Sequence, residues 1–206
     1  MNIPNKIKEL IKNYPLTKDD IGRSEDVVYL IDKKYVLKVS KNHERLLKEK
    51  QINDYLKGKV PVAESIEFEV DNEYSYYLQS YIDGESLISK KYLNNPDFLI
   101  SILKKAIDLF HSIDASNCSF KNEESEGKIF VHGDLCLPNI LVNNDEIVGF
   151  IDLGSAGVGD PWMDYAWCIW SFEYNLNSKE HTSKLIKELG IEFNQELFDK
   201  YTKMED

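Results

Sequence analysis

The pattern of apolar and polar positions divides the chain into a strand-rich first part and a helical second part. Up to about residue 85, apolar residues stand in short blocks rich in β-branched and aromatic side chains, with polar turns between them. These blocks predict two hairpins, one with strands at 27–31 and 35–39 and one with strands at 65–70 and 74–82. The segment 42–57 between the hairpins predicts a single helix in this part.

After Pro96 the apolar residues follow the period of a helix. They mark one face of a long helix, formed by Leu99, Ile102, Leu103, Ala106, Ile107 and Phe110. Residues 162–206 predict further helices, with Gly190 as a stop. A β-rich part followed by a helical part indicates an α+β fold with two lobes, 1–83 and 84–206, and a cleft between them. Amides at the turn Asp83-Gly84 suit recognition of a purine edge, although an ordinary linker explains the same signal.

A polar set interrupts the apolar pattern of the second part. The blocks 140–142 and 147–151 predict a hairpin. If its centre lies just after Asp145, then Asn139 stands opposite Asp152, roughly 5 Å away across the strands. Two oxygen ligands, with the rest of the shell left to water and phosphate, suit Mg²⁺.

Asp134 lies just upstream, on a loop before Pro138, and is predicted to lie close to Asn139 and Asp152. There it would act as a base, separate from the metal ligands. The alternative is an Asx-turn at each of the three polar positions, which is the usual role of an isolated Asp or Asn.

Two charged residues stand where the pattern predicts burial. Lys38 lies inside the strand 35–39, and Glu49 lies on the helix stripe that carries Leu46 and Ile52. Because a partly buried charge requires a partner, the two are predicted to pair. A structural ion pair is the alternative, but desolvation offsets most of what such a pair contributes. Binding of a nucleotide phosphate by the lysine explains the pair better than a structural role does.

Composition indicates a soluble globular protein. Of the 206 residues, 42% are hydrophobic and 30% are charged, and no apolar stretch approaches the length of a membrane span. The N-terminus lacks the apolar core of a signal peptide. Cys118, Cys136 and Cys168 have no metal-ligand spacing, which favours reduced thiols in the cytoplasm.

The net charge of −11 is concentrated in the second part of the chain. Residues 129–206 hold 14 Asp and Glu against 5 Lys, a net −9, which leaves −2 for residues 1–128. Such a field repels nucleic acid and attracts a cationic small molecule. An acidic surface that merely keeps the protein soluble is the alternative. No membrane partner is expected, and the chain is expected to be a monomer or weak dimer.

The polar residues of the second part form a signature at fixed spacing: His132-Gly133-Asp134, Asn139, Ile151-Asp152-Leu153-Gly154, and Asp160 and Asp164 within GDPWMDYA. This signature resembles that of the aminoglycoside phosphotransferase family, which has a protein-kinase-like fold. Segments 109–114 and 58–62 further resemble the aminoglycoside 3′-phosphotransferases. The similarity runs from about Gly22 to the C-terminus.

The resemblance implies ATP and Mg²⁺ as cofactors and a role for each matching residue. Asp134 would be the catalytic base that orients the acceptor hydroxyl, and Asn139 and Asp152 would be the Mg²⁺ ligands. Lys38 would contact the α- and β-phosphates while Glu49 holds it. In-line phosphoryl transfer requires this kind of positioning and charge neutralisation rather than a covalent nucleophile.

The same resemblance assigns further nucleotide contacts and a fold. Ser24 would contact phosphate from its loop, and the backbone at Ser80 and Ile82 would bind adenine. An antiparallel sheet with a helix would form the N-terminal, nucleotide-binding lobe, and a mainly helical C-terminal lobe would carry the catalytic hairpin. The remaining signature residues are expected to brace loops rather than react: His132, Asp160 and Asp164.

The chain departs from the family mainly in its acceptor region. Relatives carry several dozen more residues where this chain has the polar loop 121–128, and the family's Arg after the metal-binding Asp is Ser155 here. The aromatic residue that stacks on adenine in relatives aligns with Val36, and two acidic positions align with Tyr174 and Asn175. The acidic residues left for the acceptor are Glu173, Glu205 and Asp206.

The first hypothesis is therefore an ATP- and Mg²⁺-dependent phosphotransferase that acts on a hydroxyl group of a small cationic acceptor, with an aminoglycoside as the first candidate. A kinase for another small alcohol is an alternative. A nucleotide-binding remnant of the family without transferase activity is a second, different class.

Overall fold

The computed structural model of the protein describes residues 3–19 and 26–203. Two compact units divide the chain, Met1–Asp83 and Gly84–Asp206, and each is described by itself. Ser24, Glu205 and Asp206, which the sequence singles out, lie outside the described residues.

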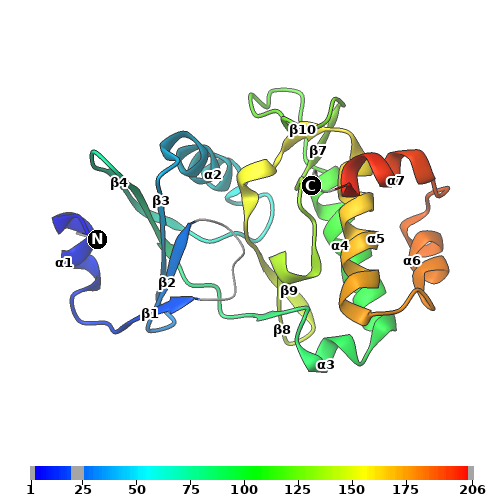
Figure 1. The fold of residues 1–206 in the computed structure, drawn as a ribbon, viewed down its shortest axis with the longest axis horizontal. Helices are drawn as coiled ribbons and strands as arrows, with labels where there is room; N and C mark the ends of the chain where they lie inside the picture. The colour runs from blue at the N-terminus through cyan, green and yellow to red at the C-terminus, as the bar shows by residue number, and fades with distance from the viewer. Residues whose placement is uncertain (1–2, 20–25, 204–206) are drawn as a thin grey trace. The chain divides into compact units, whose positions relative to one another are not determined.

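The described residues of the first unit form an antiparallel sheet of five strands in the order β1-β2-β3-β5-β4 (Figure 1). The strands follow one another in the chain with two helices around them: α1 Asn5–Ile11, β1 Leu16–Asp19, β2 Val27–Ile31, β3 Tyr35–Ser40, α2 His43–Leu56, β4 Ser65–Val70 and β5 Ser75–Ser80. Both predicted hairpins and the predicted helix are confirmed. The expectation of a single helix was wrong, because α1 and the strand β1 also form.

The pleat of β3 explains why the sheet has a helix on each face. Alternate side chains of a strand point to opposite faces. Leu37 and Val39 pack against Ile7 and Ile11 of α1, in a cluster that also holds Ile31, Tyr76 and Leu78. Lys38 therefore points to the other face, where α2 packs against β4 and β5.

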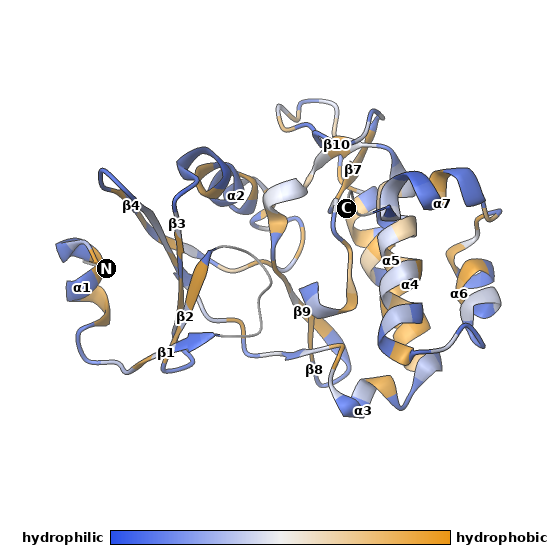
Figure 2. Ribbon diagram, in the orientation of Figure 1, coloured by the Kyte–Doolittle hydropathy of each residue, from blue (hydrophilic) through white to orange (hydrophobic). Residues whose placement is uncertain are grey.

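The second unit is mainly helical. Its helices are α3 Lys90–Leu93, α4 Pro96–His111, α5 Pro161–Leu176, α6 Thr182–Leu189 and α7 Gln195–Thr202. The apolar stripe predicted from Leu99 to Phe110 is buried on α4, and α5 packs against α4, α6 and α7. Figure 2 shows apolar residues along both α4 and α5. Gly190, with φ of 72°, ends α6 as predicted.

Short strands connect the helices of this unit. β6 Glu85–Ser86, β8 Ile140–Asn143 and β9 Glu146–Phe150 form one sheet, and β7 Ile129–Val131 pairs with β10 Gly157–Gly159. Single turns of 3₁₀-helix stand at η1 Leu137–Asn139 and η2 Leu153–Ser155. None of the helices within residues 3–19 and 26–203 has the length and apolar character needed to cross a membrane.

The hairpin of β8 and β9 forms, but its predicted register was wrong by one residue. Its turn is Asn144-Asp145, with φ of 49° and 63°, so the centre lies between these two residues. An irregularity between Leu141 and Val142 then shifts the pairing to Ile140 opposite Phe150. Continued by one residue, this register places Asn139 beside Ile151, and the amide of Ile151 donates to Asn139 O (3.1 Å).

Candidate active site

The loop between β7 and η1 is held at its base by one buried carboxylate. Asp164 of α5 is fully buried, and it accepts hydrogen bonds from the amides of His132 (3.0 Å) and Gly133 (2.8 Å). His111 Nε2 lies 3.2 Å from the same carboxylate. Buried backbone amides require such acceptors, so Asp164 fixes the path of the chain just before Asp134. Asp164 thus anchors the loop, as expected, and Asp160 caps α5 by accepting from the amide of Trp162 (2.9 Å).

His132 braces the loop from inside. Its side chain is fully buried, its ring lies 5.1 Å from that of Phe110 and 6.2 Å from that of Phe150, and its Nδ1 accepts from the amide of Asp134 (3.3 Å). An accepting Nδ1 puts the ring hydrogen of the neutral imidazole on Nε2. Within the described residues Nε2 is buried without a hydrogen-bond partner. This geometry gives His132 a bracing position rather than a path for a proton.

Asp134 and Asn139 are joined directly by the turn that η1 makes. Asn139 Nδ2 donates both to Asp134 O (2.9 Å) and to Asp134 Oδ2 (2.8 Å), and Asn139 is only 6% exposed. Because both of these bonds use the amide nitrogen, they orient the side chain so that its oxygen Oδ1 is the atom it offers to a cation. The predicted approach of Asp134 to Asn139 is therefore present in the structure.

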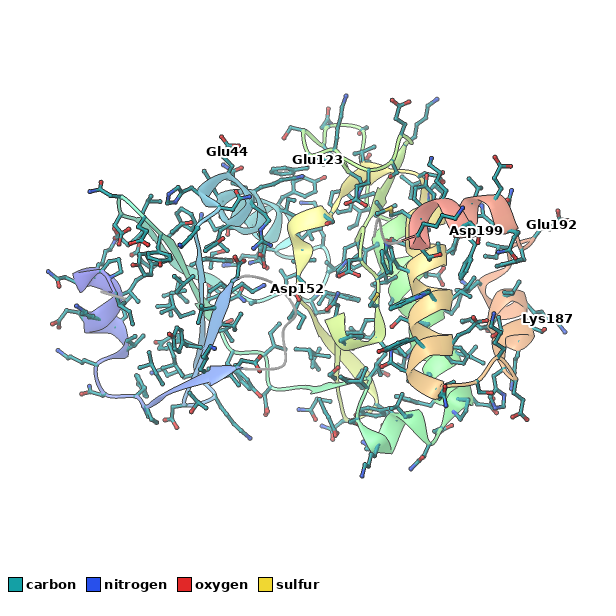
Figure 3. The ribbon with its side chains drawn as sticks, viewed as in Figure 1. Glu44, Glu123, Asp152, Lys187, Glu192 and Asp199 are labelled. Carbon is teal, nitrogen blue, oxygen red and sulfur yellow. The ribbon has the colours of Figure 1, made fainter. Side chains whose placement is uncertain are left out.

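Asp152 has a left-handed backbone, with φ of 58° and ψ of 53°, where β9 gives way to η2 (Figure 3). This conformation is uncommon for residues other than Gly, Asn and Asp, and such outliers gather at functional sites. It turns the chain immediately after Ile151, the residue bonded to Asn139.

An amide oxygen and a carboxylate one residue beyond the hairpin fit a hard cation such as Mg²⁺. In residues 3–19 and 26–203, no group of three or more His, Cys, Asp and Glu could hold a metal ion. At nucleotide sites Mg²⁺ is usually bound by one or two protein groups, with phosphate and water as its other ligands.

One residue that the sequence did not single out holds the other end of the loop. Ser171 of α5 accepts from the amide of Leu137 (3.0 Å) through its Oγ. Cys136 is buried beside it, and burial, followed by the charge of Asp134, raises the pKa of the Cys136 thiol. The thiol therefore stays protonated at neutral pH and is a poor nucleophile. Ser171 appears in the sequence only as a polar residue on a mainly apolar helix.

In the first unit the predicted pair of buried charges is confirmed. Lys38 Nζ lies 2.5 Å from Glu49 Oε1, with the two side chains 9% and 7% exposed. The pair joins β3 to α2 across the sheet face opposite α1. Asn42 caps the N-terminus of α2, because its side chain accepts a hydrogen bond from the amide of Arg45 (3.0 Å). The cap fixes where the helix that carries Glu49 begins.

The predicted adenine contacts lie at the end of β5 and beyond it. The amide of Ser80 donates to Glu64 O (2.9 Å), so a purine contact at Ser80 would have to use its carbonyl oxygen. Ile82 follows Tyr81, whose amide donates to Lys34 O (2.8 Å). Binding of adenine at Ser80 and Ile82 stays a prediction.

Glu173, the described candidate for the acceptor, is already engaged at the end of α5. Its Oε1 accepts from Thr182 Oγ1 (2.8 Å) and its Oε2 lies 3.5 Å from Lys179 Nζ. One turn away on the same helix, Trp170 and Tyr174 stack with ring centroids 5.0 Å apart, and Tyr174 is 57% exposed. This end of α5 thus exposes the ring of Tyr174 more than the carboxylate of Glu173.

Comparison with known proteins agrees with this geometry. A family model described as the phosphotransferase enzyme family matches residues 16–128 and 125–180. An aminoglycoside 3′-phosphotransferase of Enterococcus faecalis is 28% identical over 245 aligned positions, which cover 93% of this chain and 92% of that protein. An aminoglycoside 3′-phosphotransferase of Staphylococcus aureus is 27% identical with the same two coverages.

Solved structures share the fold. A crystal structure of an aminoglycoside-3′-phosphotransferase of type VIII superposes with a TM-score of 0.77 at 19% identity, covering 95% of each chain. An aminoglycoside phosphotransferase of Streptomyces rimosus, in complex with ADP and streptomycin, gives a TM-score of 0.76 at 15% identity and covers 95% of this chain and 94% of its own. The expected α+β, kinase-like fold is thereby confirmed.

The comparisons also indicate that this chain is shorter than its relatives in one segment. The alignment with the Enterococcus protein has 245 positions but uses 93% of a chain of 206 residues, or about 190 residues, so roughly 50 positions lie opposite gaps in this chain. The two matches to the family model meet at residues 125–128. This is the polar loop in which the sequence predicted a missing stretch.

Proposed function

Because the chain belongs to the phosphotransferase enzyme family, we propose that it transfers the γ-phosphate of ATP to a hydroxyl group of a small cationic acceptor, with an aminoglycoside as the first candidate. The observation that carries this proposal is the bonded pair of Asp134 and Asn139, with Asn139 Nδ2 2.8 Å from Asp134 Oδ2. The pair places two groups on one rigid turn: a carboxylate that can accept a proton and an amide oxygen that can bind a cation. A loop this fully braced argues against a remnant that has lost catalysis.

Asp134 would accept the proton of the acceptor hydroxyl while that oxygen attacks the γ-phosphorus. The new bond joins phosphorus to the acceptor oxygen, the bond to the β-phosphate oxygen breaks, and ADP leaves. Asn139 and Asp152 would hold Mg²⁺, which when bound neutralises charge on the phosphates. The rigid bonds to Asp164 and His132 keep Asp134 in place, so little reorganisation is needed during the reaction.

Lys38 would bind the phosphates of ATP from the first unit. Glu49 holds its ammonium 2.5 Å away inside the sheet, which fixes a long side chain that would otherwise be mobile. An ammonium group has three donor hydrogens, which suits it to bind phosphate oxygens. Unpaired cysteines and a need for ATP fit a cytoplasmic location as part of this proposal.

The charge of the second unit supports a cationic acceptor. Residues 129–206 hold 14 Asp and Glu against 5 Lys. A hollow of about 690 Å³ beside residues 121–127 is lined by Glu123, Glu124 and Glu126 together with Lys121 and Lys200, so three acidic residues stand against two basic ones. Such a field raises the local concentration of polycations.

A neutral alcohol is the second candidate, because two aromatic rings stack on α5 and that of Tyr174 is exposed. Trp170 and Tyr174 are stacked with an interplanar angle of 11°, and Ser171 between them bonds to the catalytic loop. Aromatic faces of this kind line small-molecule pockets and bind the apolar faces of rings. By resemblance, Tyr174 and Asn175 stand where the family has acidic residues, which weakens the case for a strongly charged acceptor.

Measurement of ADP formation with a panel of acceptors separates these candidates. We expect kanamycin and neomycin to be phosphorylated with a high KM, and with kcat/KM at least about tenfold above that of a neutral disaccharide. Two missing charge-assisted hydrogen bonds, at about 1.5–3 kcal/mol each, would weaken acceptor binding more than a hundredfold and so account for the high KM.

Ionic strength supplies the internal control for this panel. The Debye length falls from about 10 Å at 0.1 M salt to about 3 Å at 1 M. The KM for aminoglycosides should therefore rise with salt while the KM for a neutral acceptor stays constant, with Asp134→Asn as the inactive background. A neutral or anionic alcohol that outperforms every aminoglycoside would overturn the choice of acceptor and leave the phosphotransferase intact.

A further inference from the structure

The segment 121–127, called the anchor segment below, is bound to the free edge of β10. Lys121 pairs in parallel with Val158, and the amide of Asn122 donates to Val158 O (3.0 Å). Val158 in turn donates its amide to Phe120 O (2.9 Å). Figure 3 labels Glu123 on this segment, near β7 and β10. The predicted short polar loop is present here, and the attachment and the burial within it are features that the sequence did not predict.

Asn122 uses every polar atom of its side chain inside the protein. It is 5% exposed, and its Nδ2 donates to Ser155 O (2.7 Å). Its Oδ1 accepts from the amide of Glu124 (3.0 Å) and from Ser125 Oγ (2.9 Å). Ser155 ends η2, three residues after Asp152, so this amide ties the anchor segment to the segment that carries a candidate metal ligand.

Ser125 extends the same network toward α5. It is 7% exposed, and its Oγ, besides donating to Asn122, accepts from the amide of Asp160 (3.1 Å), the residue that caps α5. Glycines permit this close packing. A Cβ on Gly159 would lie 2.4 Å from Ser125 Oγ, and a Cβ on Gly127 would lie 1.9 Å from Gly159 O.

The hydrogen bond between Asn122 and Ser155 also lies against the loop between β7 and η1, which carries Asp134. Gly133 stands between His132 and Asp134 with φ of 83°. A Cβ there would lie 2.4 Å from Ser155 O and 2.8 Å from Asn122 Nδ2. The two partners of this hydrogen bond therefore pack directly on the residue that precedes the candidate base.

We propose that Asn122 is a positioning residue for phosphoryl transfer: it fixes Ser155 against Gly133, and thereby keeps the segment after Asp152 in register with Asp134. This inference rests on the proposed function. It also explains how the chain keeps an ordered catalytic loop although the segment is shorter than in its relatives. Asn122 itself contacts neither reactant, so it acts on the rate through the placement of the two carboxylates.

Asn122→Asp tests this role most directly, because it replaces only the side-chain NH₂ group by an oxygen. The carboxylate keeps an oxygen for Glu124 and Ser125, but replaces the donor that faces Ser155 O by a second oxygen. We expect kcat for ADP formation to fall at least about tenfold, since a displacement of 1 Å at a reacting centre can cost about a hundredfold. The KM for ATP should change less than about threefold, because Lys38, Asn139 and Asp152 are all retained and only the position of Asp152 relative to Asp134 is altered.

Asn95→Asp is the matched control. Asn95 is an exposed residue that caps α4 through its side chain (3.2 Å to the amide of Phe98), and Asp caps a helix equally well, so kcat should not change. Ser125→Ala removes the arm toward Asp160 and should lower kcat by a smaller factor with the same unchanged KM. Should Asn122→Asp fail to fold at the assay temperature, Ser125→Ala carries the test.

The outcomes are distinct. A lower melting temperature with kcat within twofold of the parent, in whichever of the two variants folds, would show that Asn122 only stabilises the fold and would overturn the inference. ADP formation is measured with water as the acceptor if no alcohol is turned over. A parent protein that forms no ADP at all would overturn the proposed function and this inference with it, whereas an active parent with an equally active Asn122→Asp overturns the inference alone.

Discussion

Asp134→Asn is expected to lower kcat for phosphoryl transfer by at least about a hundredfold while the affinity for ATP stays within about twofold. General base catalysis by a positioned side chain contributes roughly 10²–10⁴ in rate, and an amide cannot accept the proton. The amide does retain an oxygen for Asn139 Nδ2, which bonds to Asp134 Oδ2 at 2.8 Å in the parent. Asn is therefore preferable to Ala, which would also release the side chain of Asn139.

Steady-state kinetics and calorimetric titration with Mg-ATP separate the two quantities. Asp145→Asn provides the matched control, because Asp145 is an exposed turn residue of the same unit with φ of 63°, where Asn is equally suited. If Asp134→Asn lost ATP affinity as severely as kcat, Asp134 would be a nucleotide or metal ligand and its assignment as the base would be wrong.

Asp152→Asn is expected to abolish the Mg²⁺-dependent part of nucleotide binding. The substitution removes the negative charge but keeps a residue type that tolerates the left-handed backbone, with φ of 58°. Loss of one interaction with a charged group, at about 1.5–3 kcal/mol, corresponds to roughly a 10- to 150-fold weaker affinity.

The measurement is titration of ATP with and without MgCl₂ in both proteins. In the absence of Mg²⁺ the parent and Asp152→Asn should bind ATP equally, because Lys38 and its contacts are unchanged. An equal loss of affinity with and without Mg²⁺ would point instead to a collapsed loop, and the assignment of Asp152 as a metal ligand would not survive it.

The elements that the sequence predicts well are those whose apolar period is long and uninterrupted. The helix α4 carries its stripe from Leu99 to Phe110, and the strand β2 is a continuous apolar block before the polar turn that leads to β3. The helix α1 has seven residues, and only Ile7 and Ile11 are buried, one turn apart. So short a pattern carries little periodic signal, although Pro4 just before it is a helix-start signal.

The hairpin register could not be read from the sequence because it depends on local backbone choices. The turn Asn144-Asp145 sets the centre one residue earlier than expected, which displaces the pairing by two positions, and the irregularity between Leu141 and Val142 shifts it back by one. A register change of one residue normally sends a side chain to the opposite face. At Asp152 the left-handed backbone changes the direction of the chain, and ordinary strand geometry gives no sign of it.

The candidate site was predictable where a residue type has few other uses. Lys38 inside a strand and Glu49 on a buried stripe required each other, and they are paired. Asn122 and Ser125 lie in a polar stretch that resembles a solvated loop, yet both are buried. Their burial results from close contact with glycines distant in the sequence, which no local pattern records.

The fate of the γ-phosphate tests the account most directly. Full-length protein is incubated with ATP labelled in its γ-phosphate, Mg²⁺ and an aminoglycoside, and the label is followed by mass spectrometry of the acceptor and by assay of inorganic phosphate. We expect one labelled phosphoryl group on an acceptor hydroxyl for each ADP formed, and no transfer by Asp134→Asn. Label recovered only as inorganic phosphate across the whole panel of alcohols, or an Asp134→Asn variant as active as the parent, would contradict it.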